Sequence, residues 1–93
     1  MLFRSIIGSM SNYDKIQEAV QCFERQGQQP RYAQPSTDNL PTCIERCYTN
    51  IDWANVVIAV PKDDGTFGNG TTYEIAYAKH IGKYVIKYDG ERL

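Results

Sequence analysis

The most constraining feature of this sequence is a short apolar run, Val56-Val57-Ile58-Ala59-Val60, followed by a glycine-rich loop. A β-branched run of this length is typical of a strand buried on both faces of a sheet. The pattern next predicts a helix over residues 71–80, closed by Gly82, and a strand over residues 83–88, which together make a parallel β-α-β crossover. In such a unit the loop and the first helical turn line the crevice where ligands bind. Glu74 is expected near that turn.

The segments before this run predict the other half of a small wound sheet. Residues 2–7 are good strand formers, and a turn of small residues leads from them into a helix. Ser11 or Asn12 is expected to cap the start of this helix, and Gly27 is expected to end it. One apolar stripe runs along it, made of Ile16, Ala19, Val20 and Phe23.

The middle of the chain gives weaker signals. Residues 31–33 predict a short strand, which Pro30 and Pro35 would confine to the rim of the sheet. A second helix is expected to start near Leu40 or Pro41, since proline is tolerated in a first turn, and to continue past Ile51. Residues 61–70 form a long loop, and long loops in compact domains tend to be functional.

The order β-α-β-α-β-α-β predicts an α/β fold. We expect a small flavodoxin-like three-layer sandwich, in which a four-stranded parallel sheet of order 2-1-3-4 carries helices on both faces. Strands one and three then lie side by side. The crevice between their carboxyl ends receives residues 8–12 and 61–74, whose small residues would admit a sugar or a phosphate to close backbone contact.

Size and charge narrow the class of protein. The 93 residues are expected to form one domain, and a formal net charge of -1 gives no reason to propose nucleic acid or a membrane as a partner. A cytoplasmic protein is the simplest interpretation. The thiols of Cys22, Cys43 and Cys47 are expected to be reduced and partly buried, because with His80 as the one histidine they lack the spacing of a zinc site. No metal and no cofactor are expected.

Glu74 is the candidate for chemistry. Near a helix N-terminus, the dipole and free N–H groups favour the ionised carboxylate. A partly enclosed carboxylate can attack an anomeric carbon and hold a covalent sugar intermediate. The structural alternative is that Glu74 only complements the helix dipole, as exposed first-turn acids often do.

A family resemblance favours the chemical interpretation. The block Gly70-Thr71-Thr72-Tyr73-Glu74-Ile75-Ala76-Tyr77-Ala78, followed by Ile81-Gly82-Lys83-Tyr84-Val85-Ile86, resembles the signature of the nucleoside 2-deoxyribosyltransferase family. The related 2'-deoxynucleoside 5'-phosphate N-hydrolases are similar over the same region. The resemblance implies a flavodoxin-like domain that cleaves or transfers the N-glycosidic bond of 2'-deoxynucleosides or their 5'-monophosphates. It also implies that Glu74 is the nucleophile.

The chain departs from the family at two acidic positions. The family's aspartate six residues before the glutamate is Gly68 here, and its sugar-anchoring aspartate falls at Cys47, with Asp52 about a turn and a half later. The first loop also lacks the family's usual glycine-rich form. We nevertheless expect substrate contacts from the two loops and the helix start, and these candidates are Gly8, Ser9, Ser11, Asn12, Gly70, Thr71 and, if its loop folds back, Asp64.

Other functions stay open. One alternative is a non-catalytic nucleotide-binding or sensor module of the same fold, which would bind nucleotide without turnover. A flavodoxin-type redox domain is weaker, since the first loop lacks the Ser/Thr-rich phosphate pattern that flavin binders tend to show. Self-association into a homodimer or larger homo-oligomer is expected, because a small chain gains by burying further surface and the resembling enzymes complete their sites across subunits.

Overall fold

A computed structural model of the chain describes residues 3–32 and 48–93. The sheet has four parallel strands in the order β2-β1-β3-β4. These strands are β1 (Phe3–Gly8), β2 (Gln29–Tyr32), β3 (Val56–Val60) and β4 (Tyr84–Lys87). The predicted α/β fold and strand order are confirmed.

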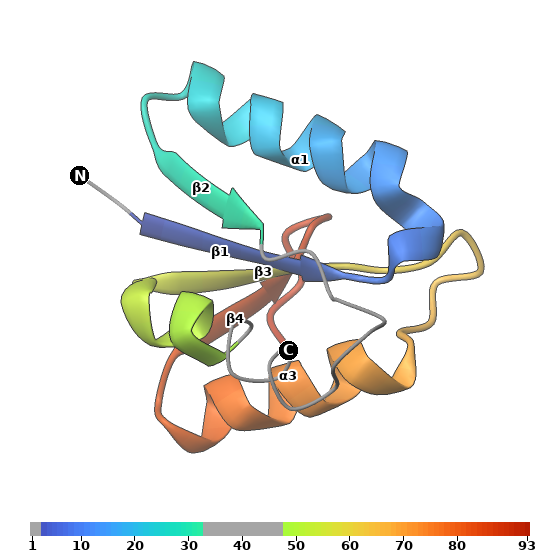
Figure 1. Cartoon of the computed structure of the whole chain (residues 1–93), viewed down its shortest axis with the longest axis vertical. Coiled ribbons are helices and arrows are strands. Elements are labelled where there is room, and N and C mark those ends of the chain that lie inside the picture. Colours follow the sequence, from blue (N-terminus) through green and yellow to red (C-terminus); the bar gives the residue numbers. More distant parts are fainter. Residues whose placement is uncertain (1–2, 33–47) are drawn as a thin grey trace.

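Helices cover both faces of this sheet (Figure 1). Helix α1 (Tyr13–Arg25) packs on one face through the predicted stripe, which joins one core cluster with Ile6, Ile58 and Val60. Helix α3 (Asn69–His80) and the helical residues 48–53 pack on the other face, where a second cluster contains Ile7, Ile51, Val57 and Ala78. The predicted start of the second helix near Leu40 or Pro41 lies outside the described residues.

Burial along the strands explains their order. The last four residues of both β1 and β3 are all buried, as expected for inner strands covered on two sides. Strand β2 alternates between exposed and half-buried residues and contains Pro30, which an edge strand tolerates. The predicted edge strand is therefore confirmed, although it begins two residues earlier, and Ala33 and Pro35 lie outside the described ranges.

Both long helices end at a glycine in the left-handed region. After α1, Gly27 has φ +77°, and after α3, Gly82 has φ +80°. The N–H groups of Gly27 and Gln28 bond back to the carbonyls of Glu24 and Phe23, and those of Gly82 and Lys83 bond to Lys79 and Ala78 in the same pattern. This pairing is the Schellman motif, and it turns the chain sharply into the next strand.

The end of the chain folds back on β4. Arg92 forms an antiparallel bridge with Ile86, and the Leu93 N–H donates to the Val85 carbonyl at 3.0 Å. The tail thus covers the open side of this edge strand. No helix in the described ranges combines the length and apolarity that crossing a bilayer requires.

Candidate active site

The predicted crevice lies at the carboxyl ends of β1 and β3, from which both loops start (Figure 1). Gly8 pairs with Val60 in the sheet. A β-carbon on Gly8 would lie 3.0 Å from Ile16 Cδ1 and 3.1 Å from the Val60 carbonyl oxygen. Such contacts are tighter than a β-carbon ordinarily makes, so glycine lets β1, β3 and α1 approach one another here without displacing a neighbour. Gly8 is buried, and its contact with a substrate stays a prediction.

The residues after Gly8 form a compact 3-10 turn over Met10–Asn12. The Ser9 and Ser11 hydroxyl oxygens are 2.9 Å apart, and the Ser11 N–H donates to Ser9 Oγ at 3.3 Å. Asn12 occupies the N-cap of α1 but makes no side-chain bond to that helix. Its Nδ2 instead donates to the Pro61 carbonyl. The predicted capping by Ser11 or Asn12 is therefore wrong, because the Asn12 side chain fastens the start of α1 to the loop after β3.

Helix α3 begins at Asn69, two residues before its predicted start, with Gly68 at the N-cap. The Gly68 carbonyl accepts hydrogen bonds from the N–H and the hydroxyl of Thr72, at 2.9 Å and 3.0 Å. Gly70 has open space where a β-carbon would stand, whereas Thr71 is buried. Of these two predicted substrate contacts, Gly70 is open to a ligand and Thr71 packs inward.

Three residues from separate segments converge beside the start of α3. A β-carbon built on Gly68 would lie 3.6 Å from Lys62 Cε and 4.0 Å from Ser9 Cβ. We call the surface around Ser9, Lys62 and Gly68 the crevice mouth. These distances are ordinary van der Waals contacts, so a side chain at Gly68, where the resembling family has an aspartate, would fit. The sequence did not indicate Lys62, because only the folded loop places it here.

Glu74 is the sixth residue of α3 and lies in its second turn, while the first turn contains no acid. Glu74 was predicted near the first turn, and it lies one turn further along because the helix begins two residues earlier than expected. The dipole acts mainly within the first turn, so its effect on Glu74 is weaker than the sequence implied. Side chains of a helix tilt toward its N-terminus. Glu74 is half-buried and lies about 9 Å along the helix axis from Gly68, on the side of the helix start that this tilt favours.

The loop after β3 is held by its own hydrogen bonds. Asp64 Oδ1 accepts from the Thr66 hydroxyl at 2.6 Å and from the Thr66 N–H at 2.9 Å. These bonds hold the pKa of the Asp64 carboxyl below its usual range, the hydroxyl contributing most. The Lys62 N–H donates to the Thr66 carbonyl at 2.8 Å, and Gly65 turns the chain with φ +84°. Asp64 therefore stabilises the loop, and its reach toward a substrate stays a prediction.

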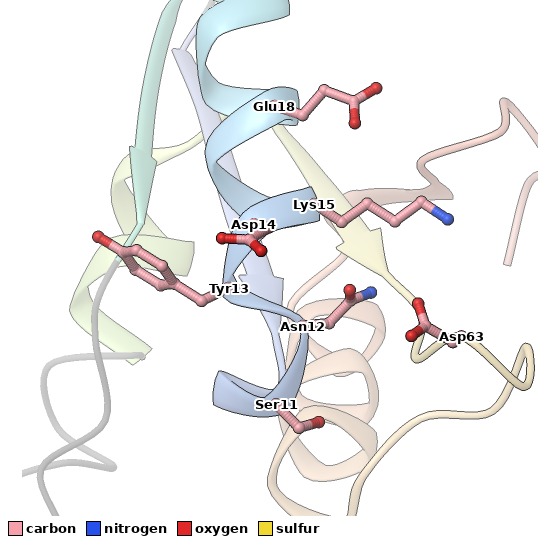
Figure 2. Close-up of a pocket in the computed structure, with 7 residues that line it drawn as sticks. All are labelled: Ser11, Asn12, Tyr13, Asp14, Lys15, Glu18 and Asp63. Atoms are coloured by element: carbon pink, nitrogen blue, oxygen red, sulfur yellow. The ribbon is translucent and has the colours of Figure 1, made fainter.

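A separate open hollow of about 450 Å³ lies on the α1 side of this loop (Figure 2). In the view, Lys15 and Glu18 extend from α1 toward the side on which Asp63 lies, and Asn12 faces Asp63. Three carboxylates and one ammonium group line the hollow, which disfavours a phosphate there. Its lining residues are Ser11, Asn12, Tyr13, Asp14, Lys15, Glu18 and Asp63. Glu74 is absent from this lining, so the hollow adjoins the predicted crevice without containing its candidate nucleophile.

The family's two acidic positions find no replacement among the described residues named from the sequence. Cys47 lies outside the described ranges. Asp52 lies in the helical segment 48–53 that leads into the start of β3, at the opposite end of the sheet from the crevice. Its Oδ1 accepts a hydrogen bond from the Tyr77 hydroxyl at 2.7 Å, which raises the pKa of Tyr77, and the Tyr77 ring stacks on Tyr48 with centroids 4.0 Å apart. Asp52 therefore belongs to the packing of α3.

Within residues 3–32 and 48–93, no group of three or more histidine, cysteine, aspartate or glutamate side chains is placed to hold a metal ion. Three kinds of polar group surround the predicted crevice: a carboxylate on α3, hydroxyls after β1 and an ammonium group after β3. Such a set can bind a polar, anionic small molecule and can present a nucleophile to it.

Comparisons with known proteins bear on the fold. No protein-family model and no curated protein matches the sequence. Among solved structures, the chain is similar to a CMP N-glycosidase from Clostridium botulinum, BcmB, with a TM-score of 0.68 and 24% sequence identity. The similarity covers 91% of this chain and 69% of the other. The four-stranded parallel α/β fold described here is therefore one that an N-glycosidase also uses.

Proposed function

We propose that this protein is a nucleoside 2-deoxyribosyltransferase-like enzyme that cleaves or transfers the N-glycosidic bond of 2'-deoxynucleosides or their 5'-monophosphates. The observation that carries the proposal is the convergence of Ser9, Lys62 and Gly68 at the start of α3, the helix that carries the half-buried Glu74. The fold shared with a CMP N-glycosidase supports the same chemistry. Residues 1–93 would form one such domain, working in the cytoplasm.

The proposed reaction has two displacement steps at the anomeric carbon. A Glu74 carboxylate oxygen attacks C1' of the sugar, and the C1'–N bond breaks with its electron pair leaving on the base, which takes up a proton. Water, or the nitrogen of a second base, then attacks C1' and releases the Glu74 carboxylate. Using a nucleophile divides one difficult substitution into two easier ones.

The remaining predicted contacts would hold the sugar and its substituents. The paired hydroxyls of Ser9 and Ser11 offer donors that can turn toward a ligand, and Gly70 leaves open space on α3. Asn12 and Gly8 support these groups by joining the loops, and Thr71 and Asp64 support them by packing and by shaping the loop.

The decisive experiment compares wild type with Glu74→Gln. Each protein is incubated with the four common 2'-deoxynucleosides, their 5'-monophosphates and cytidine 5'-monophosphate, and free base is quantified by chromatography. We expect base release by wild type and a loss of roughly a thousandfold or more in Glu74→Gln, because the nucleophile is removed while side-chain shape is kept. Glu24→Gln, at an exposed position near the end of α1, is the matched acid control and should retain the activity.

Absence of base release from every substrate would contradict the enzymatic proposal. A non-catalytic nucleotide-binding module is the second candidate, and the glycine at position 68, where the resembling family has an aspartate, favours it. That candidate predicts binding of nucleotide without turnover, measurable by calorimetry, and survival of binding in Glu74→Gln.

A further inference from the structure

Lys62 is a cation that the fold holds at the crevice mouth. It is half-buried, and its Cε lies 3.6 Å from the position of a β-carbon on Gly68. Its backbone is fixed on both sides, because its N–H donates to the Thr66 carbonyl at 2.8 Å and its carbonyl accepts from the Gly65 N–H at 2.9 Å. The aliphatic stem therefore rests against the N-cap of α3, and the ammonium group ends within reach of the mouth.

No carboxylate among the described residues forms a close ion pair with the Lys62 ammonium. Within the described part of the chain, the lysine that pairs with a carboxylate at 4.0 Å or less is Lys87, which contacts Asp89 and Glu91. Asp64 attracts Lys62 only at longer range, and its carboxylate accepts hydrogen bonds from the hydroxyl and N–H of Thr66. A partly desolvated ammonium without a counterion in direct contact gains more from binding an anion than a fully solvated lysine does.

The neighbours of Lys62 suit a phosphate. The hydroxyls of Ser9 and Ser11 lie on the facing loop and supply donors, and a lysine beside hydroxyls binds phosphate as a point charge. Lys15, the lysine beside the neighbouring hollow, is exposed and shares that hollow with Asp14, Glu18 and Asp63. Those carboxylates repel a phosphate, so Lys62 is the better placed of the two lysines.

We propose that Lys62 binds the 5'-phosphate of the substrate and makes the site selective for nucleoside 5'-monophosphates over nucleosides. This inference rests on the proposed function, because it takes the sugar to lie between Lys62 and Glu74. With the phosphate at the crevice mouth, C1' of the sugar would lie further along α3, near the carboxyl of Glu74. A free nucleoside would lose the ionic contact while keeping the others.

The test compares Lys62→Gln with Lys15→Gln as the matched control. The measured quantity is the ratio of kcat/KM for each 2'-deoxynucleoside 5'-monophosphate to kcat/KM for the corresponding nucleoside. A charge-assisted hydrogen bond of ordinary strength predicts that Lys62→Gln lowers this ratio by roughly tenfold to a hundredfold. Lys15→Gln should leave the ratio unchanged, and Lys62→Arg should restore most of it. Thermal unfolding of each variant checks that the fold is retained.

Binding measurements separate this inference from the proposed reaction. In the Glu74→Gln background, calorimetry with the same nucleotides and nucleosides should show tighter binding of the monophosphates, lost on adding Lys62→Gln. Inorganic phosphate should compete with the nucleotides for Glu74→Gln. If phosphate binds but the monophosphates bind no more tightly than the nucleosides, the inference is overturned. If wild type releases base but Lys62→Gln changes both substrate classes equally, the inference fails and the reaction stands. If no base is released but the binding preference depends on Lys62, the reaction fails and the phosphate site stands.

Discussion

Ser5 lies in the middle of β1 with its side chain fully buried, and its hydroxyl has no hydrogen-bond partner among the described residues. It shares a strand with Ile6 and Ile7, which pack into the two core clusters on opposite faces of the sheet. A buried hydroxyl without a partner loses its hydrogen bonds to water on folding and gains none in return. The buried Ser5 hydroxyl therefore lowers the stability of the folded protein.

Replacing this hydroxyl is expected to stabilise the protein. Ser5→Ala removes one polar atom and leaves little empty space, so the free energy of unfolding should rise by about 1 kcal/mol. Chemical denaturation monitored by circular dichroism measures the change, with Ser11→Ala at an exposed position as the control, expected within about 0.5 kcal/mol of wild type. A loss of stability in Ser5→Ala would mean that the hydroxyl has a partner after all.

Two residues, Glu74 and Lys62, show which parts of the candidate site could be predicted from the sequence and which could not. Glu74 was found because its neighbours resemble a known block, whereas Lys62 stood in an ordinary run of turn residues. Its position depends on the Asp64–Thr66 bonds and on the left-handed backbone of Gly65, which together fold the loop back. Such a local turn is decided by side-chain hydrogen bonds that composition does not reveal.

At the scale of elements, the two ends of α3 differ in how well the sequence predicts them. The C-terminus was predicted correctly, because a glycine after a helical segment can adopt the left-handed conformation that closes it. The N-terminus was placed two residues late, because Gly68-Asn69-Gly70 has poor helix propensity and looks like loop. The Gly68 carbonyl and the Thr72 side chain start the helix in spite of that propensity.

Two glycines of this region give a matched pair of substitutions. Neither Gly70 nor Gly82 has an atom within 4 Å of an added β-carbon, so a methyl group meets no steric barrier at either position. They differ in backbone conformation, since Gly70 lies within α3 and Gly82 has φ +80°. Gly70→Ala should therefore raise the free energy of unfolding by about 0.5–1 kcal/mol, and Gly82→Ala should lower it by about 1–2 kcal/mol.

Denaturant titration of both variants measures these changes of opposite sign. Because the substitution is the same and space is open in both places, a difference between them isolates the backbone term. Equal effects at the two positions would contradict the Schellman ending of α3 described above.

For the whole molecule, the strand order followed from the pattern of apolar residues. The continuous apolar run of β3 and the β-branched end of β1 mark inner strands, while the prolines and polar residues around β2 mark an edge. Sequential right-handed crossovers then leave few arrangements for four strands. The position of the hollow beside α1 was out of reach, because it depends on how two loops pack against each other rather than on any periodic pattern.

Self-association is the prediction that belongs to this scale. A chain of 93 residues buries a modest share of its surface, and Tyr73 on the outer side of α3 remains 70% exposed. We expect sedimentation velocity at micromolar concentration to show a homodimer or larger species. Tyr73→Glu should shift it toward monomer, whereas Tyr13→Glu on α1, 42% exposed, should not. A wild-type protein that sediments only as a monomer would contradict the prediction.

The bond from Asn12 to the Pro61 carbonyl has a consequence for how a ligand enters. Asn12 is 8% exposed, and its side chain joins the start of α1 to the loop that follows β3. This hydrogen bond opposes separation of the two segments in the absence of a ligand. Under the proposed function, discrimination among nucleobases would then depend more on fit to a preformed opening than on hinge motion.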